Sequence, residues 1–234
     1  MHYHIDTIPI WDAVKADSEC PLCLLQDQLE QKFVDFYLGD SVMESDIRIK
    51  VNQTGYCDRH YGMLYDGGEK LPLALMTHTR MNQIIEDITP HLEALAKEGK
   101  KREDIAPLLT YIENANQGCV ICDRIAEHMD RYYKTIIAMV KKESEFKDAL
   151  LDSRGFCMHH FGKVLQAADK HIGMMKRKTF LAELSRMQMA NLQRLTGEVK
   201  WFADKFDFRN AKKDWGTSRD SLPRMLNKLG GRSF

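Results

Sequence analysis

The chain has 234 residues, of which 44% are hydrophobic and 29% are charged. This composition is typical of a soluble globular protein, and the length suffices for one large domain or two small ones. Its longest apolar runs are far shorter than the roughly 20 residues that a membrane-spanning helix needs, and the N-terminus lacks the basic start and apolar segment of a signal peptide. We therefore expect a cytoplasmic protein with no membrane segment.

Formal net charge is zero, but the charges are unevenly distributed. Residues 170–234 contain 15 Lys and Arg against 6 Asp and Glu. A basic end can bind nucleic acid or an acidic partner. Because its basic residues are scattered and not grouped in blocks, we favour docking of this segment on acidic parts of the same chain.

The predicted elements are all helices. In chain order, a helix capped by Ser18 runs to about Leu38, Gly55 ends a helix, and a second helix opens at Cys57. Apolar residues at helical spacing then form a stripe of Met81, Ile84, Ile85, Ile88, Leu92 and Leu95. The second half of the chain is predicted to contain the same elements in the same order: a helix from about Cys119 to Val140, a turn at Gly155 and a helix that starts at Cys157. A second apolar stripe follows, formed by Leu181, Leu184, Leu192, Leu195, Val199 and Phe202. A short helix over Asp220–Leu229 closes the chain. No segment shows the alternation of a strand, so the predicted fold is all-α.

This order reflects an internal duplication. The sequence CPLC, which starts at Cys20, is repeated 99 residues later as CVIC, and GYCDRHYG is repeated 100 residues later as GFCMHHFG. Each half therefore reads C-x2-C, then 33 or 34 residues, then C-x2-H. Six cysteines and two of the nine histidines occupy these positions, and no cysteine is left over.

Paired Cys and His residues three apart at a helix start can point at one metal ion. The predicted ligands are Cys20, Cys23, Cys57, His60, Cys119, Cys122, Cys157 and His160. We expect an internally duplicated helical bundle with each half stapled by a metal site, residues 1–100 and 101–205 being the halves and 206–234 a tail with a short helix. Exchange of ligands between the halves is left open.

The ligand set favours zinc at two sites. Three thiolates and one imidazole match structural zinc, although an iron–sulfur cluster accepts similar ligands and is the less favoured alternative. A redox-active C-x2-C motif usually follows a strand, which is absent here, and would leave Cys57 and Cys157 without a role.

Two other features are weaker candidates for a site. Asp46, Arg48 and Asn52 lie near one helical face and could line a pocket, although a solvated face of ion pairs is the favoured interpretation. Phe206, Phe208 and Trp215 alternate with charged residues and could stack on single-stranded nucleic acid. We favour a tail whose aromatic rings pack back on the body.

The motifs TIPIWDA, ECPLC, MESDIR, VNQTGYCDRH, CVIC, GFCMHH and KFDFRN resemble, in this order, an uncharacterised bacterial family found mainly in Firmicutes and defined as a domain of unknown function. The resemblance extends from about Thr7 to Leu229, with all eight proposed ligands in place. It implies a cytoplasmic, helical, metal-binding protein, and it brings no activity with it.

Several functions fit these observations. No phosphate loop, metalloprotease helix or nucleophile elbow is present, and a four-ligand metal site has no open position for catalysis, so we assign no catalytic or cofactor-binding residues. The favoured function is interaction with a protein partner or self-association. A redox- or metal-responsive thiolate protein and nucleic-acid binding through the basic C-terminal third are the alternatives.

Overall fold

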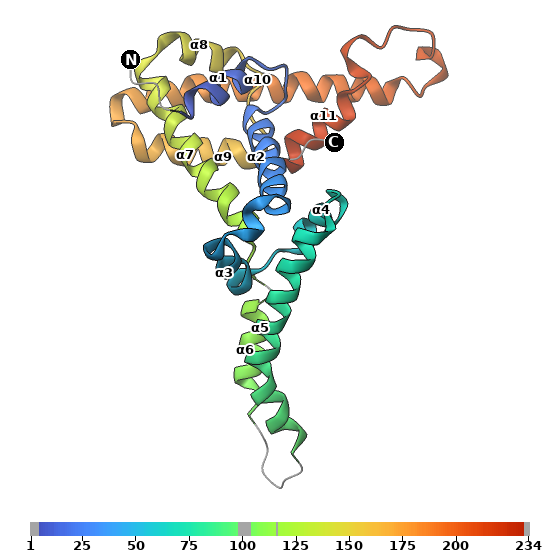
Figure 1. Cartoon of the computed structure of the whole chain (residues 1–234). Coiled ribbons are helices and arrows are strands. Elements are labelled where there is room, and N and C mark those ends of the chain that lie inside the picture. Colours follow the sequence, from blue (N-terminus) through green and yellow to red (C-terminus); the bar gives the residue numbers. More distant parts are fainter. Residues whose placement is uncertain (1–4, 98–103, 116, 232–234) are drawn as a thin grey trace. The chain divides into compact units, whose positions relative to one another are not determined.

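The computed structural model describes residues 5–97, 104–115 and 117–231, and every regular element in them is a helix (Figure 1). The helices are α1 Thr7–Lys15, α2 Pro21–Leu38, η1 Asp40–Met43, α3 Ser45–Thr54, α4 Asp58–Asp66, α5 Lys70–Ala96, α6 Ala106–Ala115, α7 Val120–Lys142, α8 Ser144–Asp152, α9 Met158–His171, α10 Met174–Asp204, η2 Phe208–Asn210, η3 Gly216–Ser218 and α11 Ser221–Gly230. The predicted all-α class and the short C-terminal helix are confirmed. None of the helices in the described part of the chain is both long and apolar enough to cross a membrane.

The chain divides into two compact units whose boundaries differ from those of the sequence repeats. The terminal unit comprises the residues up to Gln28 together with those from His128 onward, and the central unit comprises Leu29–Glu127. The boundaries fall within α2 and within α7, so each of these helices contributes to both units.

In the terminal unit, the long helix α10 packs against α8, α9 and α11. Its predicted apolar stripe supplies core residues, since Leu184 and Leu195 are fully buried. Phe146 of α8 is also fully buried, and its ring meets the edge of Trp11 on α1 at 5.1 Å. The second stripe therefore behaves as the helical periodicity predicts.

In the central unit, α3, α4 and η1 pack against α5. The predicted stripe on α5 is less well covered: Ile84 and Ile88 are half-buried, while Met81, Ile85, Leu92 and Leu95 are 42–54% exposed. The ten-residue helix α6 lies beside α5 (Figure 1), where Tyr111 donates a hydrogen bond of 2.9 Å to Asp87. Because α5 is about 40 Å long and α6 only about 15 Å, one short neighbour cannot bury the whole stripe.

Gly55 and Gly155 precede the C-x2-H motifs, and both have positive φ, of 75° and 77°. The positive φ expected at the two turns is confirmed. Gly55 is the C-cap of α3, but Gly155 lies two residues beyond Ser153, the C-cap of α8, so only Gly55 ends a helix. At the second turn the side-chain amide of Gln188 both accepts from the Phe156 N–H at 2.9 Å and donates to the Phe156 carbonyl at 2.8 Å. The turn thereby presents Cys157 as the residue that caps α9.

Replacing Gly155 by alanine should lower the free energy of unfolding by about 1–3 kcal/mol, because a non-glycine residue at this φ is strained. The added Cβ would also lie 2.7 Å from Gln188 Oε1, displacing the amide that holds the turn. Gly162→Ala is the matched control: this glycine lies within α9 with no atom near the added Cβ, so stability should rise by up to about 1 kcal/mol. Chemical denaturation of both variants measures their free energies of unfolding. Equal changes in the two variants would contradict the role of Gly155 in the turn.

Candidate metal centres

Eight Cys and His side chains gather into two groups of four, with the ligand atoms of each group within 4.8 Å of one another. The first centre consists of Cys20, Cys23, Cys157 and His160. The second centre consists of Cys57, His60, Cys119 and Cys122. These are the eight residues that the repeat singled out, and each centre lies within one compact unit.

The pairing expected within each half is wrong, because each C-x2-C motif meets the C-x2-H motif of the other half. In each half, the helix that begins at the C-x2-C motif is longer than the helix that precedes the C-x2-H motif. Helix α2 is about 27 Å long, and the ten-residue α3 is about 15 Å long. In the second half α7 spans about 35 Å and α8 about 14 Å, so the same mismatch recurs.

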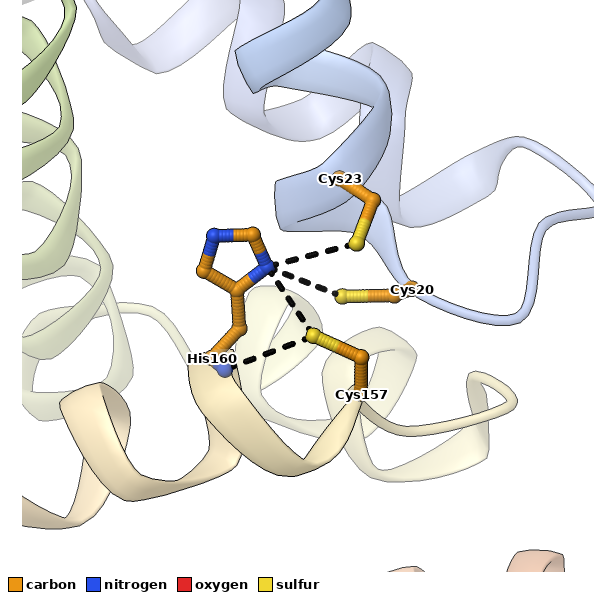
Figure 2. A group of neighbouring side chains, drawn as sticks. All are labelled: Cys20, Cys23, Cys157 and His160. Carbon is orange, nitrogen blue, oxygen red and sulfur yellow. Dashed lines mark hydrogen bonds between the residues drawn. The ribbon is translucent and has the colours of Figure 1, made fainter. Parts of the chain in front are cut away.

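In the first centre the three sulfur atoms converge on one nitrogen (Figure 2). His160 Nδ1 lies 3.5 Å from Cys20 Sγ, 3.4 Å from Cys23 Sγ and 3.3 Å from Cys157 Sγ. One imidazole nitrogen cannot make three hydrogen bonds at once. A single tetrahedral ion bound at the usual zinc distances would place sulfur and nitrogen about 3.6 Å apart, so the residues fit one metal ion.

The second centre has the same geometry. His60 Nδ1 lies 3.2 Å from both Cys57 Sγ and Cys119 Sγ and 3.4 Å from Cys122 Sγ. The Sγ atoms of Cys57 and Cys122 are 3.9 Å apart, close to the roughly 3.8 Å edge between two sulfurs of a tetrahedral zinc site.

Helix starts bring the ligands together. Cys20 and Cys23 lie at the start of α2 and Cys119 and Cys122 at the start of α7, while Cys57 and Cys157 cap α4 and α9. Cys157 Sγ accepts the His160 N–H at 3.4 Å. Unpaired N–H groups and the positive end of the helix dipole favour thiolate over thiol, so the local structure prepares each cysteine for metal binding.

The outer nitrogen of each histidine contacts a polar group on α2. His160 Nε2 lies 3.1 Å from Gln26 Oε1, and His60 Nε2 lies 3.1 Å from Glu30 Oε1. Arg59 holds the Glu30 carboxylate through a fork of two hydrogen bonds and keeps its pKa below the ordinary value, although burial acts in the opposite direction. Such partners fix the ring so that Nδ1 faces the metal position. Their charges differ, with a neutral amide at the first centre and a carboxylate at the second.

Protons and a metal ion compete for the first centre. Although burial disfavours its charged form, hydrogen bonds with Cys157 and Cys20 raise the pKa of His160 to about 9. Hydrogen bonds from Cys20 and Cys23 lower the pKa of the Cys157 thiol, and the bond with Cys157 raises that of Cys23. Because a metal ion binds thiolates, metal binding at this centre would release the protons of the thiols.

A buried ionic cluster stands directly beside the first centre. The side chain of Glu19, next to Cys20, is 2% exposed. Burial raises its pKa, but hydrogen bonds and charge from the surrounding cations hold that pKa below the ordinary 4.5. Four basic side chains surround the carboxylate, namely Arg154, Arg194, Arg224 and Lys228. Three of them come from the basic C-terminal segment, so this part of it docks on an acidic residue of the same chain, as favoured from sequence.

The two centres differ in the hydrogen bonds that connect the segments carrying their C-x2-C and C-x2-H motifs. At the first centre the buried Lys228 of α11 donates to the carbonyls of both Glu19 and Arg154, which precede the two ligand motifs. At the second centre the Val120 N–H donates directly to the Gly55 carbonyl at 3.1 Å. Gly118, which corresponds to Glu19 in the repeat, allows this approach, since an added Cβ would lie 2.5 Å from Thr54.

Sequence reasoning missed the residues that support the ligands. Glu19 and Lys228 are 209 positions apart, and no periodicity links them. The one available signal was the excess of basic residues near the C-terminus, which indicated an acidic partner without naming it. Gln188 gave no signal at all, because a glutamine on a long helix is ordinarily solvated.

The two weaker candidate regions, one face of α3 and the aromatic residues of the C-terminal tail, differ in how far their side chains are exposed. Asp46 and Arg48 are exposed on α3, in agreement with a solvated face, whereas Asn52 of the same predicted face is half-buried. In the tail, Trp215 packs against Phe202 at 5.7 Å, as expected. Phe206 also contacts Phe202, at 5.6 Å between ring centroids, although it is 77% exposed. Phe208 is 87% exposed, so the expectation that the tail's aromatic rings pack on the body is wrong for this residue.

The comparisons with known proteins give a family and no activity. Residues 1–234 match the family described as Family of unknown function (DUF6062). The chain belongs to this family. DUF6062 membership agrees with the resemblance carried by the duplicated motifs.

A relative in the bacterium Caldicellulosiruptor sp. (strain Rt8B.4), described as an uncharacterized 23.9 kDa protein in the xynA 3' region, is 22% identical over 194 residues. That match covers 83% of this chain and 85% of the relative. No solved structure matches this member of DUF6062.

The crossed pairing predicts which double substitutions remove one ion and which remove two. Cys23→Ser with Cys157→Ser should abolish one of two Co²⁺ sites, detected by the thiolate charge-transfer absorption. Cys23→Ser with Cys57→Ser should abolish both, because these residues serve different centres. Pairing within each half would give the reverse result.

Glu19→Gln should lower the free energy of unfolding by about 3–5 kcal/mol, because it leaves buried cations without their partner. Since the pKa of Glu19 is depressed, its contribution is complete above about pH 4.5 and is lost on acidification through the folded-state pKa. Asp17→Asn is the control: this carboxylate pairs with Arg154 but is 78% exposed, so its loss should cost less than about 1 kcal/mol. Urea denaturation at pH 7 and pH 4 compares the variants, and equal costs would refute the special role of Glu19.

Proposed function

We propose that this protein is a zinc-stabilised helical interaction protein, with one structural zinc ion in each centre and a self-association surface on α5 and α6. The observation that carries the proposal is the convergence of three sulfurs on one histidine nitrogen in each centre. The exposed apolar stripe of α5 supports the interaction role.

The donor set supports zinc as the metal. Thiolate and imidazole ligands suit zinc, and four protein ligands complete its tetrahedral shell. An iron–sulfur cluster binds its ligands through different iron atoms, which spreads those ligands apart. The 3.2–3.5 Å separations between sulfur and nitrogen suit one ion better than a cluster.

The closed shell supports a structural role for the ion. With four protein ligands, no position remains for a substrate or an activated water. Each ion would join two helix starts that are distant along the chain, such as Cys23 and Cys157, and so hold contacts whose loop closure is costly in entropy.

The surface of α5 and α6 supports association. Met81, Ile85, Leu92 and Leu95 of α5 are exposed, and so are Ile105, which precedes α6, and Leu109 and Ile112 within α6. Monomeric proteins rarely expose apolar side chains in such a long row. Met81, Ile85, Ile88, Leu92 and Leu95 follow alternating steps of four and three, the spacing of a coiled-coil seam.

A second copy of this chain is the partner that this face fits. It offers a stripe of the same length, and symmetric pairing of identical patches is the commonest mode of self-association. Between Leu71 and Ile85 the helix has one charged residue, Arg80, which is buried and donates to the carbonyls of Asn52 and Gln53. Like charges would therefore not oppose one another along this N-terminal part of the helix, while Glu86, Asp87 and Glu93 lie along the part that follows.

Nucleic-acid binding receives less support. Arg194, Arg224 and Lys228 of the basic segment are engaged by Glu19, and Lys200 and Arg209 pair with neighbouring aspartates. Fewer cations then remain to face phosphates.

Purified protein should contain about two zinc ions per chain and show no visible absorption. Removal of zinc by a strong chelator should lower the helical circular-dichroism signal and the Tm, because metal binding is coupled to folding. Zinc added back to the chelated protein should restore both. A brown protein with charge-transfer bands, or unchanged helicity after complete metal removal, would overturn the proposal.

Ile85→Asp should shift the protein from dimer to monomer in analytical ultracentrifugation, because a buried unpaired charge would break the apolar interface. Ile49→Asp provides a matched control, since Ile49 is an equally exposed isoleucine on α3, 53% against 50%. This control should leave the dimer intact. Wild-type protein that stays monomeric at high concentration would exclude the second copy and leave an unlike protein as the occupant.

A further inference from the structure

The two centres have identical ligand types but differ in accessibility. All four ligands of the first centre are buried. In the second centre Cys119 and His60 are buried, Cys57 is partly exposed and Cys122 is exposed. A cavity of about 370 Å³ extends to Cys20 and Cys23 of the first centre, but these side chains are only 1% and 2% exposed. The second centre is therefore the more accessible of the two to solvent and small reagents.

The C-terminal segment accounts for this difference. Helix α11 packs against α9, which carries His160. At its end, a Cβ added to Gly231 would lie 3.3 Å from Cys157 Sγ, so this backbone lies directly over a ligand. The second centre lies in the central unit, where no counterpart of α11 covers it among the described residues. The duplication thus supplies a protected centre and an open one.

The two reachable sulfurs of the open centre are also neighbours. Cys57 Sγ and Cys122 Sγ are 3.9 Å apart and come from different helices, α4 and α7. Thiolates bound to zinc remain nucleophilic toward peroxides, and susceptibility to oxidation follows thiolate character and exposure. A second thiolate within reach of the first oxidised sulfur allows a disulfide to form.

We infer that the second centre is a peroxide-sensitive thiol site at which Cys122 is oxidised first and Cys57 closes a disulfide, with release of that zinc ion alone. This inference rests on the proposed zinc occupancy and goes beyond it by assigning a modification site. The oxidant is a hydroperoxide, of which hydrogen peroxide is the smallest.

The steps balance as follows. The Cys122 thiolate attacks one peroxide oxygen, the O–O bond breaks, and a sulfenic acid and one hydroxide form. The Cys57 thiolate then attacks the Cys122 sulfur, the S–O bond breaks, and a second hydroxide leaves. Two thiolates and one peroxide thus give one disulfide and two hydroxides. The zinc ion loses two of its four ligands and is released.

The test treats zinc-loaded full-length protein with a small molar excess of hydrogen peroxide in the presence of a chromogenic zinc chelator. About one zinc per chain should be released rapidly, with the second retained at least tenfold longer. Peptide mass spectrometry should find a disulfide between Cys57 and Cys122, with Cys20, Cys23 and Cys157 still reduced. The buried first centre is the internal control, since it has the same ligand set.

Two variants separate the roles of the cysteines. Cys122→His keeps a fourth ligand without the reactive sulfur and should retain both ions through the peroxide pulse. Cys57→His should leave the oxidised Cys122 as a sulfenic acid that dimedone traps. If a variant fails to fold, the disulfide map of the wild-type protein still decides the pairing.

Several results would overturn the inference. Equal release from both centres, earlier loss from the first centre, a disulfide between Cys119 and Cys122, or dimedone on another cysteine would each contradict it while leaving two structural zinc ions intact. Untreated protein without zinc would instead contradict the proposed function, and this inference with it.

Discussion

Four ligand atoms must approach one point in each centre, and this requirement fixes the arrangement of the helices around it. The first centre joins the starts of α2 and α9, and the second joins those of α4 and α7. A helix start supplies free N–H groups and a favourable dipole, so it can hold thiolates at a small cost in free energy. The glycine turns at Gly55 and Gly155 then aim each C-x2-H motif at its partner, and Gln188 holds the second of these turns.

The surroundings of the two centres differ because the duplicated halves have diverged beside the ligands. At corresponding positions Glu19 collects basic side chains from α10 and α11, whereas Gly118 permits close backbone contact with Thr54. The arrangement around Glu19 requires the C-terminal segment, which also covers the ligands of the first centre. The second needs only a hydrogen bond between Val120 and Gly55, and it leaves Cys122 open to solvent. The same set of Cys and His residues thus occurs in two environments: one buries the cysteine sulfurs, and the other exposes Cys122 to solvent.

The apolar stripes show where helical periodicity succeeds and where it does not. Both stripes were read correctly as one face of a helix, since the 3.6-residue period is a local property. Burial is not local. Leu184 and Leu195 are enclosed because α8, α9 and α11 lie around α10, whereas Ile85 and Leu92 remain about half-exposed on α5. The same pattern therefore yields a core in one half and an accessible face in the other.

The sequence by itself determined the helical class and picked the eight ligands, because a duplicated motif selects His60 and His160 from nine histidines without any knowledge of the fold. Only the tertiary structure decided which of these side chains share a centre. Spacing along the chain is nearly equal in the two halves and allows either pairing. In the folded chain each C-x2-C motif meets the C-x2-H motif of the other half, an arrangement that depends on how the helices pack and not on the spacing. The contact of Glu19 with Lys228 likewise depends on folding, since it joins residues from opposite ends of the chain.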